Sequence, residues 1–152
     1  MKKVIFMPIF LLLTVAVTAQ AANPKYDKAL ADSVGADAYG MKMYVLVILK
    51  TGQNKTANKT LSDSLFAGHF QNIWRLATAG KLAVSGPIKE NDKGYRGIFI
   101  LNCKTVEEAT LLLATDPAIS SKLLDAEMFQ WYGSAALPLY LPFHDKVRRN
   151  DF

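Results

Sequence analysis

His69 is the side chain in this sequence whose type and position best suit proton transfer. On a helix projection at about 100° per residue it falls within an apolar arc, beside Leu65, Ile73 and Leu76. An imidazole in such a place is partly desolvated and needs a hydrogen-bond partner. If a carboxylate holds one ring nitrogen, the other can act as a general acid or base. The alternative is a core histidine satisfied by backbone or water, and position alone does not separate the two.

Asp116 is the candidate partner for this imidazole. It precedes Pro117 at the expected end of a helix, and an Asp in this position also makes local hydrogen bonds in ordinary turns. Asp125 and Glu127 lie two residues apart on an expected strand, so they share one face. That face could line a cleft or be a solvated sheet edge.

Ser85 and Gly86 come directly before Pro87, at the expected end of a strand. Exposed amides in such a turn can hold an anionic ligand, although the same residues often do no more than end a strand. The sequence has no nucleotide-binding glycine motif and no nucleophile elbow. Its histidines and its single cysteine, Cys103, lack the spacing of metal ligands. We therefore expect no cofactor and no metal, and a buried, inert Cys103.

Four apolar runs of strand length and two capped helical segments are expected to position these residues. The strands are expected at 43–49, 81–88, 95–103 and 124–132, and the helices at 60–79, with Thr60 as N-cap, and 105–115, with Thr105 as N-cap. The order β-α-β-β-α-β predicts an α+β, ferredoxin-like fold, with a four-stranded antiparallel sheet and two helices on one face.

The first and third strands are apolar on both faces. If Val45 and Val47 face the helices, Leu46 and Ile48 face away and need a cover of their own. A second copy of the sheet would provide it, as a homodimer with a barrel-like interior. The alternative is a monomer covered by its own N-terminal arm and C-terminal tail.

The first residues have the parts of an export signal. A basic start at Lys2 and Lys3 precedes an apolar run and the small-residue exit Ala19-Gln20-Ala21, which predicts cleavage after Ala21. A retained membrane anchor is the alternative, but the run is shorter than the roughly 20 apolar residues of a spanning helix. We expect a periplasmic or secreted protein that has no membrane contact after cleavage. The predicted parts are a signal peptide (1–21), a linker or arm (22–41), a domain (42–134) and a C-terminal tail (135–152).

The charge balance argues against a nucleic-acid partner. Removal of Lys2 and Lys3 with the signal lowers the formal net charge from +5 to +3. The remaining basic residues are spread through loops and turns rather than gathered in one stripe.

From about Tyr44 to Ser134 the chain resembles the YCII-related family, a branch of the dimeric α+β barrel group. The resemblance is carried by Gly68-His69, Gly80-Lys81-Leu82, Ser85-Gly86-Pro87, Tyr95-Arg96-Gly97-Ile98-Phe99-Ile100-Leu101, Glu107-Glu108-Ala109 and Thr115-Asp116-Pro117. It implies a ferredoxin-like protomer that dimerises through its sheet, and an active-site pair of His69 and Asp116. Ser85, Gly86 and Arg96 are the candidate ligand-binding residues within these motifs.

Three kinds of function remain open at this point. The first is an exported enzyme of lyase, isomerase or hydrolase type that acts on a small organic molecule through the His69–Asp116 pair. The second is a non-catalytic module that binds a small ligand, and the third is a structural or partner-binding domain.

Overall fold

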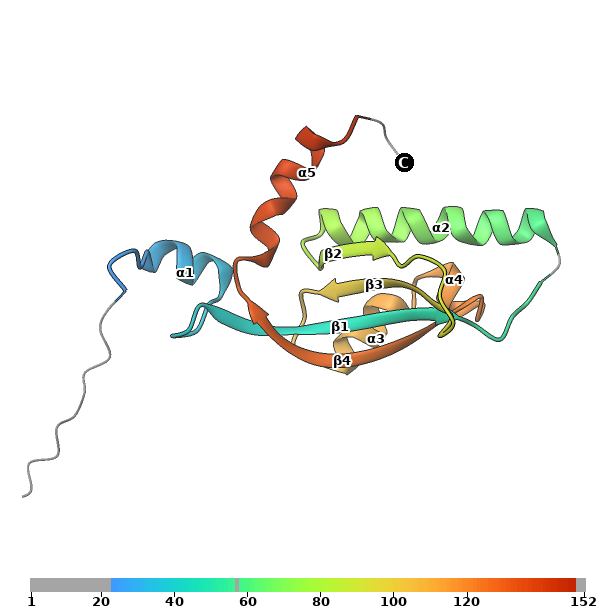
Figure 1. The fold of residues 1–152 in the computed structure, drawn as a ribbon, viewed down its shortest axis with the longest axis horizontal. Helices are drawn as coiled ribbons and strands as arrows, with labels where there is room; N and C mark the ends of the chain where they lie inside the picture. Colours follow the sequence, from blue (N-terminus) through green and yellow to red (C-terminus); the bar gives the residue numbers. More distant parts are fainter. Residues whose placement is uncertain (1–22, 57, 150–152) are drawn as a thin grey trace, which may run out of the picture.

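Four strands form one antiparallel sheet in the order β2-β3-β1-β4 (Figure 1). The computed structural model describes residues 23–56 and 58–149. The predicted signal peptide and its cleavage site lie outside the described residues. In chain order the elements are α1 (Lys28–Val34), β1 (Met41–Thr51), α2 (Lys59–Thr78), β2 (Leu82–Pro87), β3 (Tyr95–Leu101), α3 (Val106–Leu113), α4 (Pro117–Ser120), β4 (Leu124–Ser134), η1 (Leu137–Tyr140) and α5 (Leu141–Val147).

The connection of these strands confirms the predicted ferredoxin-like fold. One helix, α2, joins β1 to β2, and the pair α3–α4 joins β3 to β4. All three helices contribute to a single core against one face of the sheet. Its buried members are Val45, Val47, Leu49, Leu76, Leu82, Phe99, Leu101, Cys103, Ala109, Leu113, Ala118 and Leu124.

Three local features differ from the expected elements. The N-cap of α2 is Asn58 rather than Thr60: the Asn58 side chain accepts a hydrogen bond from the Leu61 amide at 3.1 Å. An Asn side chain caps a helix as well as a Thr side chain does, so α2 begins at Lys59, directly after Asn58. Residues 116–123, expected to be a short connection before the last strand, contain the short helix α4, whose N-cap is Asp116. Within the expected N-terminal arm, α1 forms but buries none of its residues.

The sheet face away from the helices is apolar and remains partly open. Leu46, Ile48, Ile98 and Ile100 are half-buried on it, and Phe129 of β4 is 51% exposed. A salt bridge of 2.5 Å between Lys50 and Glu127 lies on the same face.

The C-terminal tail packs elsewhere. The Tyr140 hydroxyl donates to the backbone oxygen of Ala83 on the edge strand β2, and the Arg148 guanidinium lies 5.4 Å from the centre of the Trp74 ring on α2. Figure 1 shows α1 and α5 leaving from the same end of the sheet and extending away from it. In the described ranges no helix has both the length and the apolar character that crossing a membrane requires.

Candidate active site

The structure brings His69 and Asp116 into direct contact. Nδ1 of His69 lies 2.7 Å from Oδ2 of Asp116. The Asp116 side chain is fully buried and His69 is 6% exposed. The two residues come from different elements, the middle of α2 and the N-terminus of α4, so the fold itself creates the pair.

A glycine next to the histidine allows this contact. A Cβ atom on Gly68 would stand 2.5 Å from Cγ of Pro117, much closer than van der Waals contact permits. Gly68 precedes His69 and Pro117 follows Asp116, so the close approach of α2 and α4 sets the spacing of the pair. Here glycine is required by packing, not by its backbone conformation.

The Asp116 carboxylate has a separate role for each oxygen. Oδ1 accepts from the backbone amides of Ala118 and Ile119 at 3.0 and 3.3 Å, which caps α4. Oδ2 accepts from His69 and, at 3.2 Å, from the side-chain amide of Asn72. Asp116 therefore fulfils both possibilities left open by the sequence: it is a helix cap and the partner of the imidazole.

Asn72 is a buried member of the site that the sequence analysis missed. Its Oδ1 accepts from Arg75 at 2.7 Å and from the Thr115 hydroxyl at 3.1 Å, and Arg75 also donates to Thr115 at 2.8 Å. This network fixes the amide so that its nitrogen faces Asp116. The signal was present in the sequence, since Asn72 follows His69 by three residues and shares its helix face.

The electrostatics of the pair decide which ring nitrogen carries the proton. Burial raises the pKa of Asp116, but the hydrogen bond and charge of His69, with the Ile119 and Asn72 donors, outweigh it and hold the pKa below its ordinary value of 3.8. At neutral pH Asp116 is thus an anion that can only accept hydrogen bonds. Nδ1 of His69 must then carry a hydrogen, and in the neutral ring Nε2 has the free lone pair.

The His69 imidazole lies among three phenylalanine rings. The imidazole stacks on Phe99 at 5.8 Å between ring centres, and Phe66 and Phe70 lie at 6.3 and 5.7 Å. No described residue makes a hydrogen bond to Nε2. Because every fully enclosed side-chain nitrogen or oxygen in the described part of the chain has a partner, Nε2 keeps some contact with solvent, although His69 as a whole is only 6% exposed.

The three candidate ligand-binding residues are not gathered around His69. Ser85 pairs with Phe99 in the sheet, so it lies on the helix side next to the ring on which His69 stacks. Gly86 pairs with Ile98 and belongs to the opposite face. Arg96 is exposed beside a β-bulge near the start of β3. Ser85 alone of these residues is placed to meet a molecule bound at the pair.

Other reactive groups do not join the site. Among residues 23–56 and 58–149, no three His, Cys, Asp or Glu side chains cluster closely enough to hold a metal ion. Burial, with a smaller contribution from Glu108, raises the pKa of the Cys103 thiol to about 11, so the thiol is protonated at neutral pH.

The chain was compared with known proteins. No family model matches it, and no curated protein does. Among solved structures, it is similar to 5-chloro-2-hydroxyhydroquinone dehydrochlorinase (TftG) from Burkholderia phenoliruptrix AC1100, in complex with 2,5-dihydroxybenzoquinone. The two share 18% identity over 57% of this chain and 92% of the other, with a TM-score of 0.40.

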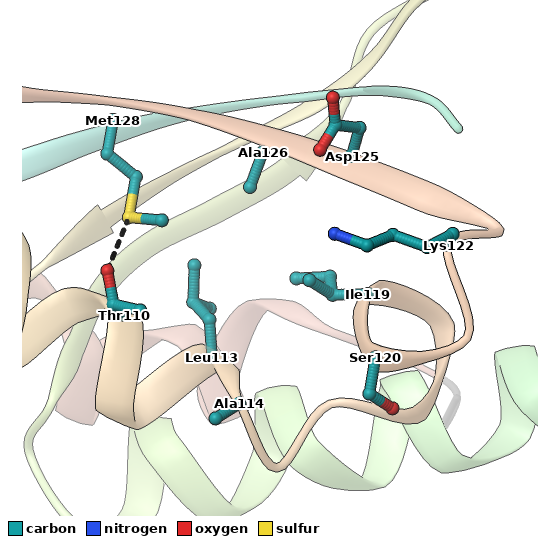
Figure 2. Close-up of a pocket in the computed structure, with 9 residues that line it drawn as sticks. All are labelled: Thr110, Leu113, Ala114, Ile119, Ser120, Lys122, Asp125, Ala126 and Met128. Atoms are coloured by element: carbon teal, nitrogen blue, oxygen red, sulfur yellow. Dashed lines mark hydrogen bonds between the residues drawn. The ribbon is translucent and has the colours of Figure 1, made fainter. Parts of the chain in front are cut away.

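A cavity of about 350 Å³ lies between α3, α4 and β4 (Figure 2). Neither His69 nor Asp116 lines it.

Proposed function

We propose that this chain is an enzyme acting on a small organic molecule, with Nε2 of His69 as the general acid/base. The observation that carries the proposal is the contact of 2.7 Å between Nδ1 and the buried Asp116 carboxylate. A carboxylate in that place fixes the ring and stabilises its protonated form, while the opposite nitrogen remains free for a substrate.

The chemistry follows from the tautomer. Nε2 takes a proton from a carbon or oxygen of the substrate, or from an attacking water, and the positive charge of the ring is balanced by Asp116. The same proton then passes to the product or the leaving group, which balances the reaction for a lyase, an isomerase or a hydrolase. The aromatic rings of Phe66, Phe70 and Phe99 favour a flat or apolar substrate over a highly charged one.

The test is H69Q in the chain that starts at Ala22, with H144Q as the matched control. His144 is the other histidine and lies on α5, away from the pair. The proteins would be assayed on aryl esters, enolisable ketones and β-substituted carbonyl compounds, one panel for each reaction class. We expect H69Q to lower turnover by about 10²- to 10⁴-fold and H144Q to leave it unchanged. Equal turnover by H69Q and the parent, with equal thermal stability, would remove His69 from the mechanism.

We also propose that two copies pack their open sheet faces together. The exposed Phe129, on the edge strand β4, lies opposite Leu46 on an apolar surface that the chain itself leaves partly uncovered. Light scattering with size exclusion would test this with F129K, and with L111K as control, because Leu111 is 73% exposed on α3 at the other side of the sheet. We expect F129K to be a monomer and L111K to remain a dimer.

Export completes the proposal. The predicted signal favours a periplasmic or secreted enzyme, and expression of the full chain with mass spectrometry of its N-terminus would test it. We expect an exported product that begins at Ala22. A cell-retained product that begins at Met1 would contradict export.

A further inference from the structure

The cavity between α3, α4 and β4 combines an apolar wall with a single cation. Figure 2 shows the side chains of Leu113, Ile119, Ala126 and Met128 directed into it. At one end of the cavity the exposed Thr110 hydroxyl donates to the Met128 sulfur at 3.9 Å. The volume of about 350 Å³ falls at the small end of the range found for small-molecule sites.

Lys122 supplies the cation, from a backbone position that rarely holds a lysine. Its φ is +62°, and every other described residue with positive φ is a glycine. Lys122 directly follows Ser121, the C-cap of α4, at the position where glycine is the usual residue. Glycine would hold this turn with less strain, so the turn does not explain the lysine.

The Lys122 ammonium makes no hydrogen bond or salt bridge with any other described residue. Figure 2 shows its side chain extending along the cavity, above Ile119 and below Asp125 in this view. No described carboxylate lies within salt-bridge distance of it. The last carbonyl groups of α4 are already occupied, since the Pro117 oxygen accepts from the Ser121 amide and the Ile119 oxygen accepts from the Lys122 amide. The ammonium is therefore not a helix cap.

Asp125 lies on the rim of the same cavity, on the strand face that also carries Lys50. The Glu127 hydrogen bond, with smaller contributions that include the charge of Asp125, raises the pKa of Lys50. In the sheet register Asp125 lies directly opposite Lys50, and Lys122 is the cation among the residues that line the cavity.

We propose that this cavity binds a small monocarboxylate with an aliphatic or aromatic body. The carboxylate pairs with Nζ of Lys122 at the mouth, and the body packs among Leu113, Ile119 and Met128. The proposal does not rest on catalysis by His69, which lines no part of this cavity.

The test uses the chain from Ala22, with benzoate and its uncharged analogue benzamide as probes. Isothermal titration at low salt would measure both dissociation constants, and NMR would follow the methyl signals of Leu113, Ile119 and Met128. We expect benzoate to bind about tenfold more tightly than benzamide, with shifts confined to these methyl groups. Equal affinity for the two probes would mean a neutral apolar ligand, and no binding of either would mean that the site does not bind small carboxylates; both results would overturn the proposal.

Two variants separate the charge from the fold. K122N suits the left-handed backbone and K122Q keeps an unbranched polar side chain without the charge, so at least one should fold as the parent does. We expect both to bind benzoate and benzamide alike, while K89Q, which removes an exposed lysine of the β2–β3 connection, keeps the preference. A126F, which fills the cavity, should abolish the binding of both probes. An unchanged preference for benzoate in a folded K122N or K122Q would refute the role of Lys122.

Discussion

Replacing Gly68 by alanine tests whether packing of α2 on α4 creates the His69–Asp116 pair. The new Cβ would lie 2.5 Å from Cγ of Pro117, about 1 Å inside ordinary contact, so the two helices must part. The hydrogen bond between His69 and Asp116 is now 2.7 Å and is lost if the helices part by that amount.

The magnitude follows from three contributions. Overpacking costs about 1–3 kcal/mol, and loss of a hydrogen bond to a charged group costs about 1.5–3 kcal/mol. Alanine regains about 1 kcal/mol of helix propensity over glycine. We therefore expect G68A to lower the free energy of unfolding by about 1.5–5 kcal/mol. In a helix without this contact the same change would stabilise the protein, so the sign alone is informative.

Urea unfolding at pH 7 would measure this, with A67G as calibration, because Ala67 is the exposed neighbour on the same helix. A67G should cost about 1 kcal/mol. Adding P117A to G68A removes the obstructing ring carbon and should restore part of the loss, which a double-mutant cycle would show as a coupling energy. A G68A protein more stable than the parent, or G68A and P117A effects that simply add, would refute close packing as the origin of the pair.

Three further predictions concern single groups. The pKa of Asp116 is held below 3.8 in the folded state, so its contribution to stability is present above about pH 3.8 and is lost as the pH falls through the lower folded value; urea unfolding between pH 5 and pH 2 should therefore show a weaker acid dependence for D116N than for the parent. Cys103, with its pKa raised to about 11, should resist iodoacetamide at pH 7.5 in the folded protein and react once urea unfolds it, as mass spectrometry would show. N58A should lower thermal stability by the equivalent of about 1 kcal/mol, whereas T60A should have little effect; the reverse order would contradict Asn58 as the cap.

The order of strands and helices along the chain was predictable because local sequence patterns agree with the tertiary structure. Apolar runs of strand length and the cap at Thr105 are local, and the Thr105 hydroxyl does accept from the Glu108 amide at 3.2 Å. The His69–Asp116 contact was also within reach, because a polar residue on an apolar helix face needs a partner. Whether Asp116 provides that partner depends on the Gly68–Pro117 approach, which joins residues 49 positions apart and leaves no local pattern.

Other features had no signal strong enough to predict them. The helix α4 is four residues long, too short to show a period. The cavity depends on the distance of α3 and α4 from β4, which no local pattern reports. Its cation, Lys122, occupies a turn position with positive φ, where glycine is the usual residue. In this chain, elements that follow from periodicity were predictable, whereas gaps between elements were not.

The two oxygens of Asp116 provide a way to separate its structural role from its chemical role. Capping α4 needs only an acceptor, which Asn, Ser or Thr supplies as well as Asp. The contact with His69 needs more, because Nδ1 has to remain a donor for Nε2 to act as a base. In D116N the oxygen can stay on the Ala118 and Ile119 amides while the new NH₂ group faces His69, which forces Nδ1 to accept and moves the hydrogen to Nε2. In a serine-protease triad the equivalent change lowers kcat by about 10⁴-fold through the same change of tautomer. If Asp116 were only a cap, D116N would keep both stability at neutral pH and activity, whereas a positioning role predicts a folded protein whose turnover falls as far as that of H69Q.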